Sequence, residues 1–161
     1  MVSYSSATFA RMNPATAAAN ALIQKALLGA AVESFGLSHQ FPILEFRDDG
    51  PEDHLLSFDT EMTSNVVFDE AHGLAEDEKM LLVFYRVNLR LVTRVACDDH
   101  ANLFLEFDNG VHLRFAGTPK EVTSEPWQVA SQTPLEEPGG YLVIATYDGG
   151  YAIWDGDATT T

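Results

Sequence analysis

The chain has 161 residues and a formal net charge of −15, which comes from 24 acidic side chains and 9 Lys or Arg side chains. Hydrophobic residues make up 46% of it and charged residues 20%, a balance that excludes a disordered or fibrous protein. Such acidity disfavours nucleic acids and anionic membranes as partners and favours basic proteins. No apolar run reaches the roughly 20 residues that span a bilayer, and the single Cys97 excludes an internal disulfide. We therefore expect one cytoplasmic domain.

A helix followed by three strands is predicted for the first third of the chain. In "NPATAAANALIQKALLG", Asn13 is a candidate N-cap, Pro14 suits the first helical position and Gly29 ends the helix. Short apolar runs separated by turn residues then predict an antiparallel meander. Its strands lie near residues 30–37, 41–47 and 54–61.

The next segment, "LAEDEKMLLVFYR", fits two secondary structures. Acidic residues ahead of an apolar run are typical of the first turn of a helix, here at 75–86. The Val, Phe and Tyr content of the same run also suits a long strand, and periodicity does not separate a buried helix from a buried strand. Composition leaves both open, and an internal repeat decides between them.

The stretches "ILEFRDDGPEDHLLSF" and "FLEFDNGVHLRF" indicate one unit used twice. Val92 follows Val32 by 60 residues, and Leu105 follows Leu44 by 61. Both halves have the order helix, strand, strand, turn, strand, so the repeat predicts a helix in the disputed segment. The first copy has the longer and more acidic turn, as loops readily accept insertions. The two copies span about residues 13–62 and 73–116.

The remainder predicts further antiparallel strands. Asn109 and Gly110 are typical of a type I′ hairpin turn, and a group of three short strands follows within about 122–155. Core packing is the favoured role of Trp127 and Trp154, with surface anchors as the alternative. The predicted fold class is α+β, with two αβββ-like repeats and the C-terminal strands forming a largely antiparallel sheet that two helices cover.

The second half resembles a family of small bacterial proteins of unknown function, of the kind found in actinobacteria. The resemblance rests on a hairpin turn, an acidic-x-Trp strand and a closing Gly-Gly-x-x-Ala-hydrophobic-Trp motif. The residues that carry it are Asn109, Gly110, Glu125, Trp127, Gly149, Gly150, Ala152 and Trp154. The resemblance implies a toxin-immunity protein and carries over no functional residue.

Residues that could bind a metal or carry catalysis are few. Asp98, Asp99 and His100 offer ligand atoms, but adjacent residues rarely converge on one ion, which favours a turn. His54 and His112 both precede the last strand of a repeat, but they are out of step by one residue and so fall on opposite faces. We therefore expect no enzyme, no metal and no cofactor.

Acidic residues concentrate on the turns and helix starts. Loops at one end of a sheet would present them as a continuous surface that attracts a basic partner. The sequence thus predicts a non-enzymatic immunity protein that neutralises a bacterial toxin by occlusion. A small-molecule site in a cleft between the repeats and an acidic mimic of nucleic acid remain open. The candidate partner-binding residues are Asp48, Asp49, Glu52, Asp53, Asp69, Glu70, Glu76 and Asp77.

Overall fold

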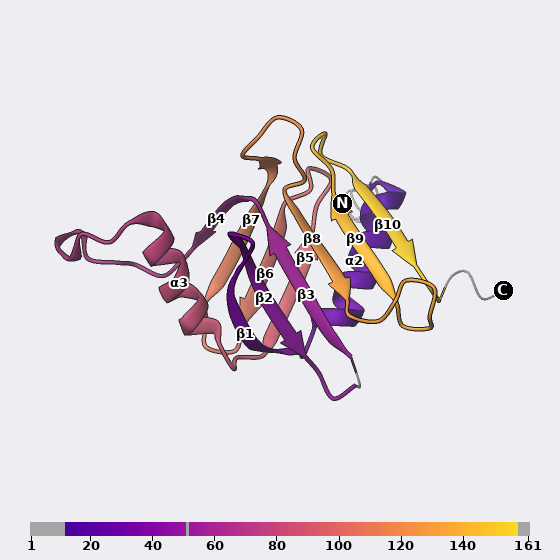
Figure 1. Ribbon diagram of the computed structural model, residues 1–161, viewed down its shortest axis with the longest axis horizontal. Coiled ribbons are helices and arrows are strands. Elements are labelled where there is room, and N and C mark those ends of the chain that lie inside the picture. The colour runs from indigo at the N-terminus through magenta and orange to yellow at the C-terminus, as the bar shows by residue number, and fades with distance from the viewer. Residues whose placement is uncertain (1–11, 51, 158–161) are drawn as a thin grey trace, which may run out of the picture.

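The computed structural model describes residues 12–50 and 52–157. Helices and antiparallel strands build that part of the chain (Figure 1). The helices are α2 (Pro14–Leu27), the 3₁₀ helix η1 (Glu70–His72) and α3 (Glu76–Val87). The strands are β1 (Ala31–Ser38), β2 (Phe41–Arg47), β3 (Asp53–Phe58), β4 (Thr60–Ser64), β5 (Val92–Cys97), β6 (Leu103–Phe107), β7 (His112–Pro119), β8 (Trp127–Ser131), β9 (Tyr141–Ala145) and β10 (Tyr151–Asp155). The predicted α+β class is confirmed.

The strands divide between two sheets, where the sequence predicted one. A six-stranded sheet has the order β1-β2-β3-β8-β9-β10 and a four-stranded sheet the order β4-β7-β6-β5. The predicted strand at 54–61 is broken at Asp59, where the chain passes from one sheet to the other. The buried hydroxyl of Thr60 anchors the new strand, because its one proton is shared between the carbonyl oxygens of Ala116 and Thr118, which lie 2.8 and 2.6 Å from Oγ1.

The core lies between the sheets and is built from equivalent residues of the two repeats. Alternate residues of the hairpin strands face inward, and each Leu or Phe buried in this way contributes about 1.5–3 kcal/mol. The ring centroids of Phe58 and Phe115 lie 4.7 Å apart in an edge contact. The buried pairs of the two repeats are Leu44 with Leu105, Phe46 with Phe107, Leu56 with Leu113, and Phe58 with Phe115.

The two repeats meet around an approximate twofold axis. The Gly29 N–H donates to the Val92 carbonyl at 2.9 Å, and the Leu89 N–H donates to the Val32 carbonyl at 2.6 Å. The two bonds are symmetric copies, since each residue of one bond lies 60 positions from its counterpart in the other. Gly29 and Leu89 also share a left-handed backbone, with φ of 82° and 64°. These backbone hydrogen bonds thus have the same spacing of 60 residues as the repeat in the sequence.

Helix α2 packs against β5, β9 and β10, whereas α3 packs against β1. Figure 1 shows α2 behind β8 and β9 of the six-stranded sheet, and α3 at the left of the view, on the side of β1. The side chain of Asn20 in α2 pairs with the backbone of Cys97, donating to its carbonyl at 2.7 Å and accepting from its N–H at 2.9 Å. Gln24 donates to the Val95 carbonyl at 3.2 Å. These side chains cover the free edge of β5, which would otherwise expose unpaired backbone groups.

Helix α3 occupies the segment that composition left undecided, so the helix predicted from the repeat is confirmed and the strand is excluded. Its first turn carries Glu76, Asp77 and Glu78, as the helix dipole favours. The Glu78 carboxylate accepts from the Ala75 N–H at 3.0 Å and so satisfies a backbone donor at the helix start.

The hairpin turn at Asn109 and Gly110 differs from the sequence prediction. Asn109 does not have the positive φ that a type I′ turn requires; only Gly110 does, at 84°. Phe107 pairs with Val111 across a three-residue loop, and the Asn109 side chain donates to the Arg86 carbonyl at 2.9 Å. The positive pair lies instead between β1 and β2, where His39 and Gln40 have φ of 50° and 71°.

Candidate functional site

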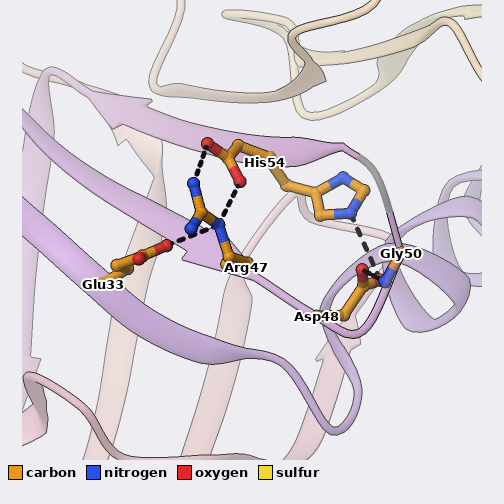
Figure 2. Close-up of polar contacts among 6 residues, drawn as sticks. Glu33, Arg47, Asp48, Gly50 and His54 are labelled. Atoms are coloured by element: carbon orange, nitrogen blue, oxygen red, sulfur yellow. Dashed lines mark hydrogen bonds and ion pairs between the residues drawn. The ribbon is translucent and has the colours of Figure 1, made fainter.

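The turn between β2 and β3 is held by an ion-pair cluster at its base (Figure 2). The Arg47 guanidinium donates to both carboxylate oxygens of Asp53 and lies 2.8 Å from the Glu33 carboxylate. The hydrogen bond from Arg47 lowers the pKa of Asp53. These contacts therefore hold together the ends of β2 and β3 that flank the turn.

Beyond this base, Asp48 joins the turn to a buried histidine. One oxygen of its carboxylate accepts from the Gly50 N–H at 2.7 Å, and the other lies 3.5 Å from His54 Nε2 (Figure 2). The Nδ1 atom of His54 and the Tyr141 hydroxyl are within hydrogen-bonding distance, at 2.9 Å. His54 is 6% exposed, and burial, followed by the charges of Glu52 and Asp48, raises the pKa of Tyr141.

A pocket of about 180 Å³ opens beside His54, between α2, the β2–β3 turn and the ends of β9 and β10. We call it the His54 pocket. Its one lysine, Lys25, lies 3.5 Å from the Asp157 carboxylate. The Gly139 N–H donates to that carboxylate at 3.0 Å and lowers its pKa. The remaining acidic residues of the lining are Asp48, Glu52 and Asp155.

Gly139 sets how closely the Glu52 carboxylate approaches the wall of this pocket. A Cβ atom at position 139 would lie 2.5 Å from Glu52 Oε1. The residue also has φ of 89°, which glycine adopts without strain. The carboxylate therefore packs directly on glycine backbone at the pocket mouth.

A second and larger hollow lies on the other side of the β2–β3 turn, where the two repeats meet. It has a volume of about 820 Å³, and we call it the leucine groove. Leu28, Leu89 and Leu91 line it with 53%, 71% and 47% of their surface exposed. The polar side of its lining consists of Glu33, Arg47, Asp48 and Asp49. Asp48 and Gly50 line both hollows, so the turn separates an acidic pocket from an apolar groove.

The structure brings together three of the four acids predicted on the β2–β3 turn. Asp48 and Glu52 line the His54 pocket, and Asp48 and Asp49 line the leucine groove. Asp53 is instead paired with Arg47, so its charge is largely neutralised by a neighbour.

The other four predicted acids lie on the segment between β4 and α3 and on the first turn of α3, a part of the chain that projects from another side of the molecule (Figure 1). Asp69 accepts from the Ala71 N–H at 2.9 Å and caps η1. Glu76 lies 3.3 Å from Lys79, and Asp77 belongs to the first turn of α3. Glu70 and Glu76 line a separate groove of about 350 Å³ between β4 and α3. The two acidic sets are therefore apart and do not form one surface.

The residues considered for metal binding form a turn. Asp98 accepts from the backbone N–H groups of His100 and Asn102, each at 2.9 Å. Within residues 12–50 and 52–157, no group of three His, Cys, Asp or Glu side chains is placed to hold a metal ion. His112 lies on the outer side of the four-stranded sheet, with Nδ1 3.5 Å from Glu106, far in the fold from the buried His54.

Of the residues that line the His54 pocket, only Asp48 and Glu52 were predicted as site residues. His54 shares the inward alternation of Leu56 and Phe58, so its burial was readable from the sequence. Tyr141, Asp155 and Asp157 reach the pocket through the pairing of β3 with β8, β8 with β9 and β9 with β10. No local pattern reveals such a juxtaposition.

Comparison with models of protein families, with curated proteins and with solved structures finds no match for this chain. No helix in the described part of the chain is long and apolar enough to cross a membrane. The two hollows and the turn between them are therefore the candidate functional site.

Proposed function

We propose that the chain is a non-enzymatic cytoplasmic protein that binds and occludes a basic protein partner, in the way that an immunity protein neutralises a toxin. The contact site is the β2–β3 turn with the His54 pocket and the leucine groove on its two sides. The observation that carries the proposal is Leu89, a strained and exposed apolar residue in a groove that the acidic β2–β3 turn borders.

The backbone conformation of Leu89 is energetically unfavourable. A left-handed backbone costs a residue with a Cβ about 1–2 kcal/mol, and the symmetric position in the first repeat is Gly29. With 71% of its surface exposed, Leu89 recovers little of that cost by burial. Strain retained at an exposed apolar side chain is typical of a binding site.

The surroundings suit a partner with one apolar and one cationic side chain. The leucines would receive the apolar side chain, and Asp49 on the rim would attract positive charge at long range. The His54 pocket is smaller than the roughly 300 Å³ of a typical small-molecule site. Its acidic lining suits one Lys or Arg side chain.

A small-molecule role has one observation in its favour. The leucine groove lies at the junction of the repeats, and its volume of about 820 Å³ is within the range of ligand sites. An apolar ligand would then bind without the charge dependence expected for a protein partner.

The experiment is a titration of the purified chain against the product of the neighbouring gene, by calorimetry at low and high salt. We expect a complex that weakens as salt rises. Glu52→Gln, which removes a pocket charge, should weaken it several-fold at low salt. Glu121→Gln removes the same charge from an exposed residue outside both hollows and should not. Absence of a complex at low salt, or equal effects of the two variants, would contradict the proposal.

A further inference from the structure

The outer faces of the two sheets differ in chemistry. On the four-stranded sheet, Arg94 lies 3.5 Å from Glu106, and the Arg114 guanidinium lies 5.9 Å from the centre of the exposed Phe104 ring. Paired charges, and an aromatic ring with an arginine over it, are typical of a sheet face in contact with water. This face needs no partner.

The outer face of the six-stranded sheet is apolar over β3, β8, β9 and β10, whereas the ion pair of Arg47 with Asp53 makes it charged next to the β2–β3 turn. Leu55, Ala130, Leu142 and Trp154 are direct neighbours across β3, β8, β9 and β10. The next row across β2, β3, β8, β9 and β10 consists of Ile43, Ser57, Gln128, Ile144 and Ala152. Alternate residues of the same strands belong to the core, so these side chains point away from it. Glu45, beside Leu55, is the one charged side chain that extends these two rows onto β2.

No described element covers this face. In Figure 1 the six-stranded sheet lies in front, and both the helices and the second sheet lie behind or beside it. Trp154 is 49% exposed, whereas Trp127 is 1% exposed and donates from Nε1 to the Ala101 carbonyl. The expected core role is thus confirmed for Trp127 and wrong for Trp154.

We propose that this face is the interface of a homodimer in which two copies pack their six-stranded sheets against each other. At a net charge of −15, two copies repel through most of their surfaces. The apolar rows are where they can approach without opposing many carboxylates. A basic partner would gain little from a face with so little charge, so a second copy fits it better.

The size of the face sets the strength of the dimer. Six strands about 4.8 Å apart, with rows of about five residues at about 3.3 Å each, give a flat footprint of about 400 Å² per copy. Two copies together bury about 800 Å², below the limit of about 1,000 Å² for a stable specific interface and in the range of weak, transient complexes. We therefore expect a reversible dimer, with the sheets packed about 10 Å apart.

Analytical ultracentrifugation over a range of concentrations tests the interface. The molar mass should rise toward twice the 17.7 kDa of the chain. Leu142→Lys and Trp154→Lys should each keep it at the monomer value, while Phe104→Lys on the other sheet should dimerise like the unmodified chain. Circular dichroism and cooperative urea unfolding would show that each variant is folded.

Salt separates this proposal from the binding of a basic partner. Added salt screens the repulsion between copies and should strengthen the dimer, while it should weaken the complex with the partner. A chain that stays monomeric at high salt and high concentration would overturn the dimer, and so would dimerisation unaffected by both lysine variants. Loss of partner binding in Leu142→Lys would assign the face to the partner instead.

Discussion

Leu89 and Gly29 occupy equivalent positions of the two repeats and share a backbone conformation, but only one of them is suited to it. Asparagine tolerates the left-handed region better than leucine. We expect Leu89→Asn to raise the free energy of unfolding by about 0.5–1 kcal/mol and to weaken partner binding, as measured by urea unfolding and calorimetry. Leu28→Asn is the control for stability alone, because Leu28 lines the same groove but is exposed at φ of −64° and carries no such strain.

The buried Tyr141 makes the free energy of unfolding fall at alkaline pH. Burial raises its pKa in the folded protein, so above about pH 10 the unfolded chain loses a proton that the folded chain retains. The free energy of unfolding then falls by up to about 1.4 kcal/mol per pH unit from this group. Burial acts in the same direction on Cys97, whose pKa it raises to about 11.

Urea unfolding at neutral and alkaline pH measures this loss. Tyr141→Phe should be less stable at neutral pH because its contact with His54 is lost, but its stability should fall less steeply above about pH 10. The same slope in both proteins would show that Tyr141 ionises as freely as in the unfolded chain.

How far single residues were predictable depended on whether their role is local. The inward position of His54 follows from alternation with Leu56. Its contact with Tyr141 depends on the placement of β8 between β3, which carries His54, and β9, which carries Tyr141. Trp154 was misassigned because alternation does not tell which side of a sheet is covered. Covering is a property of the tertiary fold.

At the scale of elements, the edge of β5 is closed by side chains of α2. Asn20→Ala removes both of its hydrogen bonds with Cys97 and leaves a partly buried backbone pair without its partner. We expect a loss of about 1–2 kcal/mol in the free energy of unfolding, measured by urea unfolding.

Alanine is the better helix former, so a loss in this variant reports the edge contacts and not the helix itself. An unchanged or higher free energy of unfolding would mean that water replaces Asn20 at no cost.

The repeat was the strongest guide to the elements. It assigned α3 as a helix where periodicity was ambiguous, because a copy inherits the structure of its counterpart. The break at Asp59 was missed. The predicted strands at 30–37 and 41–47 placed a turn at His39 and Gln40, but not its left-handed backbone. Neither carries the Gly, Pro or Asn that marks such sites in a sequence.

At the scale of the whole molecule, the acidic residues have different tasks on different sides. Those near α3 cap helices and favour the helix dipole, whereas those on the β2–β3 turn border two hollows. The sequence showed that negative charge lies on loops, but not which loops are neighbours. The proposed dimer leaves the His54 pocket free, because its lining faces the inner side of the sheet.

The packing of α2 also orders the events of synthesis. This helix leaves the ribosome first among the described elements, yet its contacts are with β5, β9 and β10. Its apolar side, with Ile23 and Leu27, is buried only after β5, β9 and β10 have been synthesised. Contacts so distant in sequence slow folding. A nascent chain halted after the first repeat would hold an unsatisfied helix, which makes completion of the last strands the step that commits the molecule to its fold.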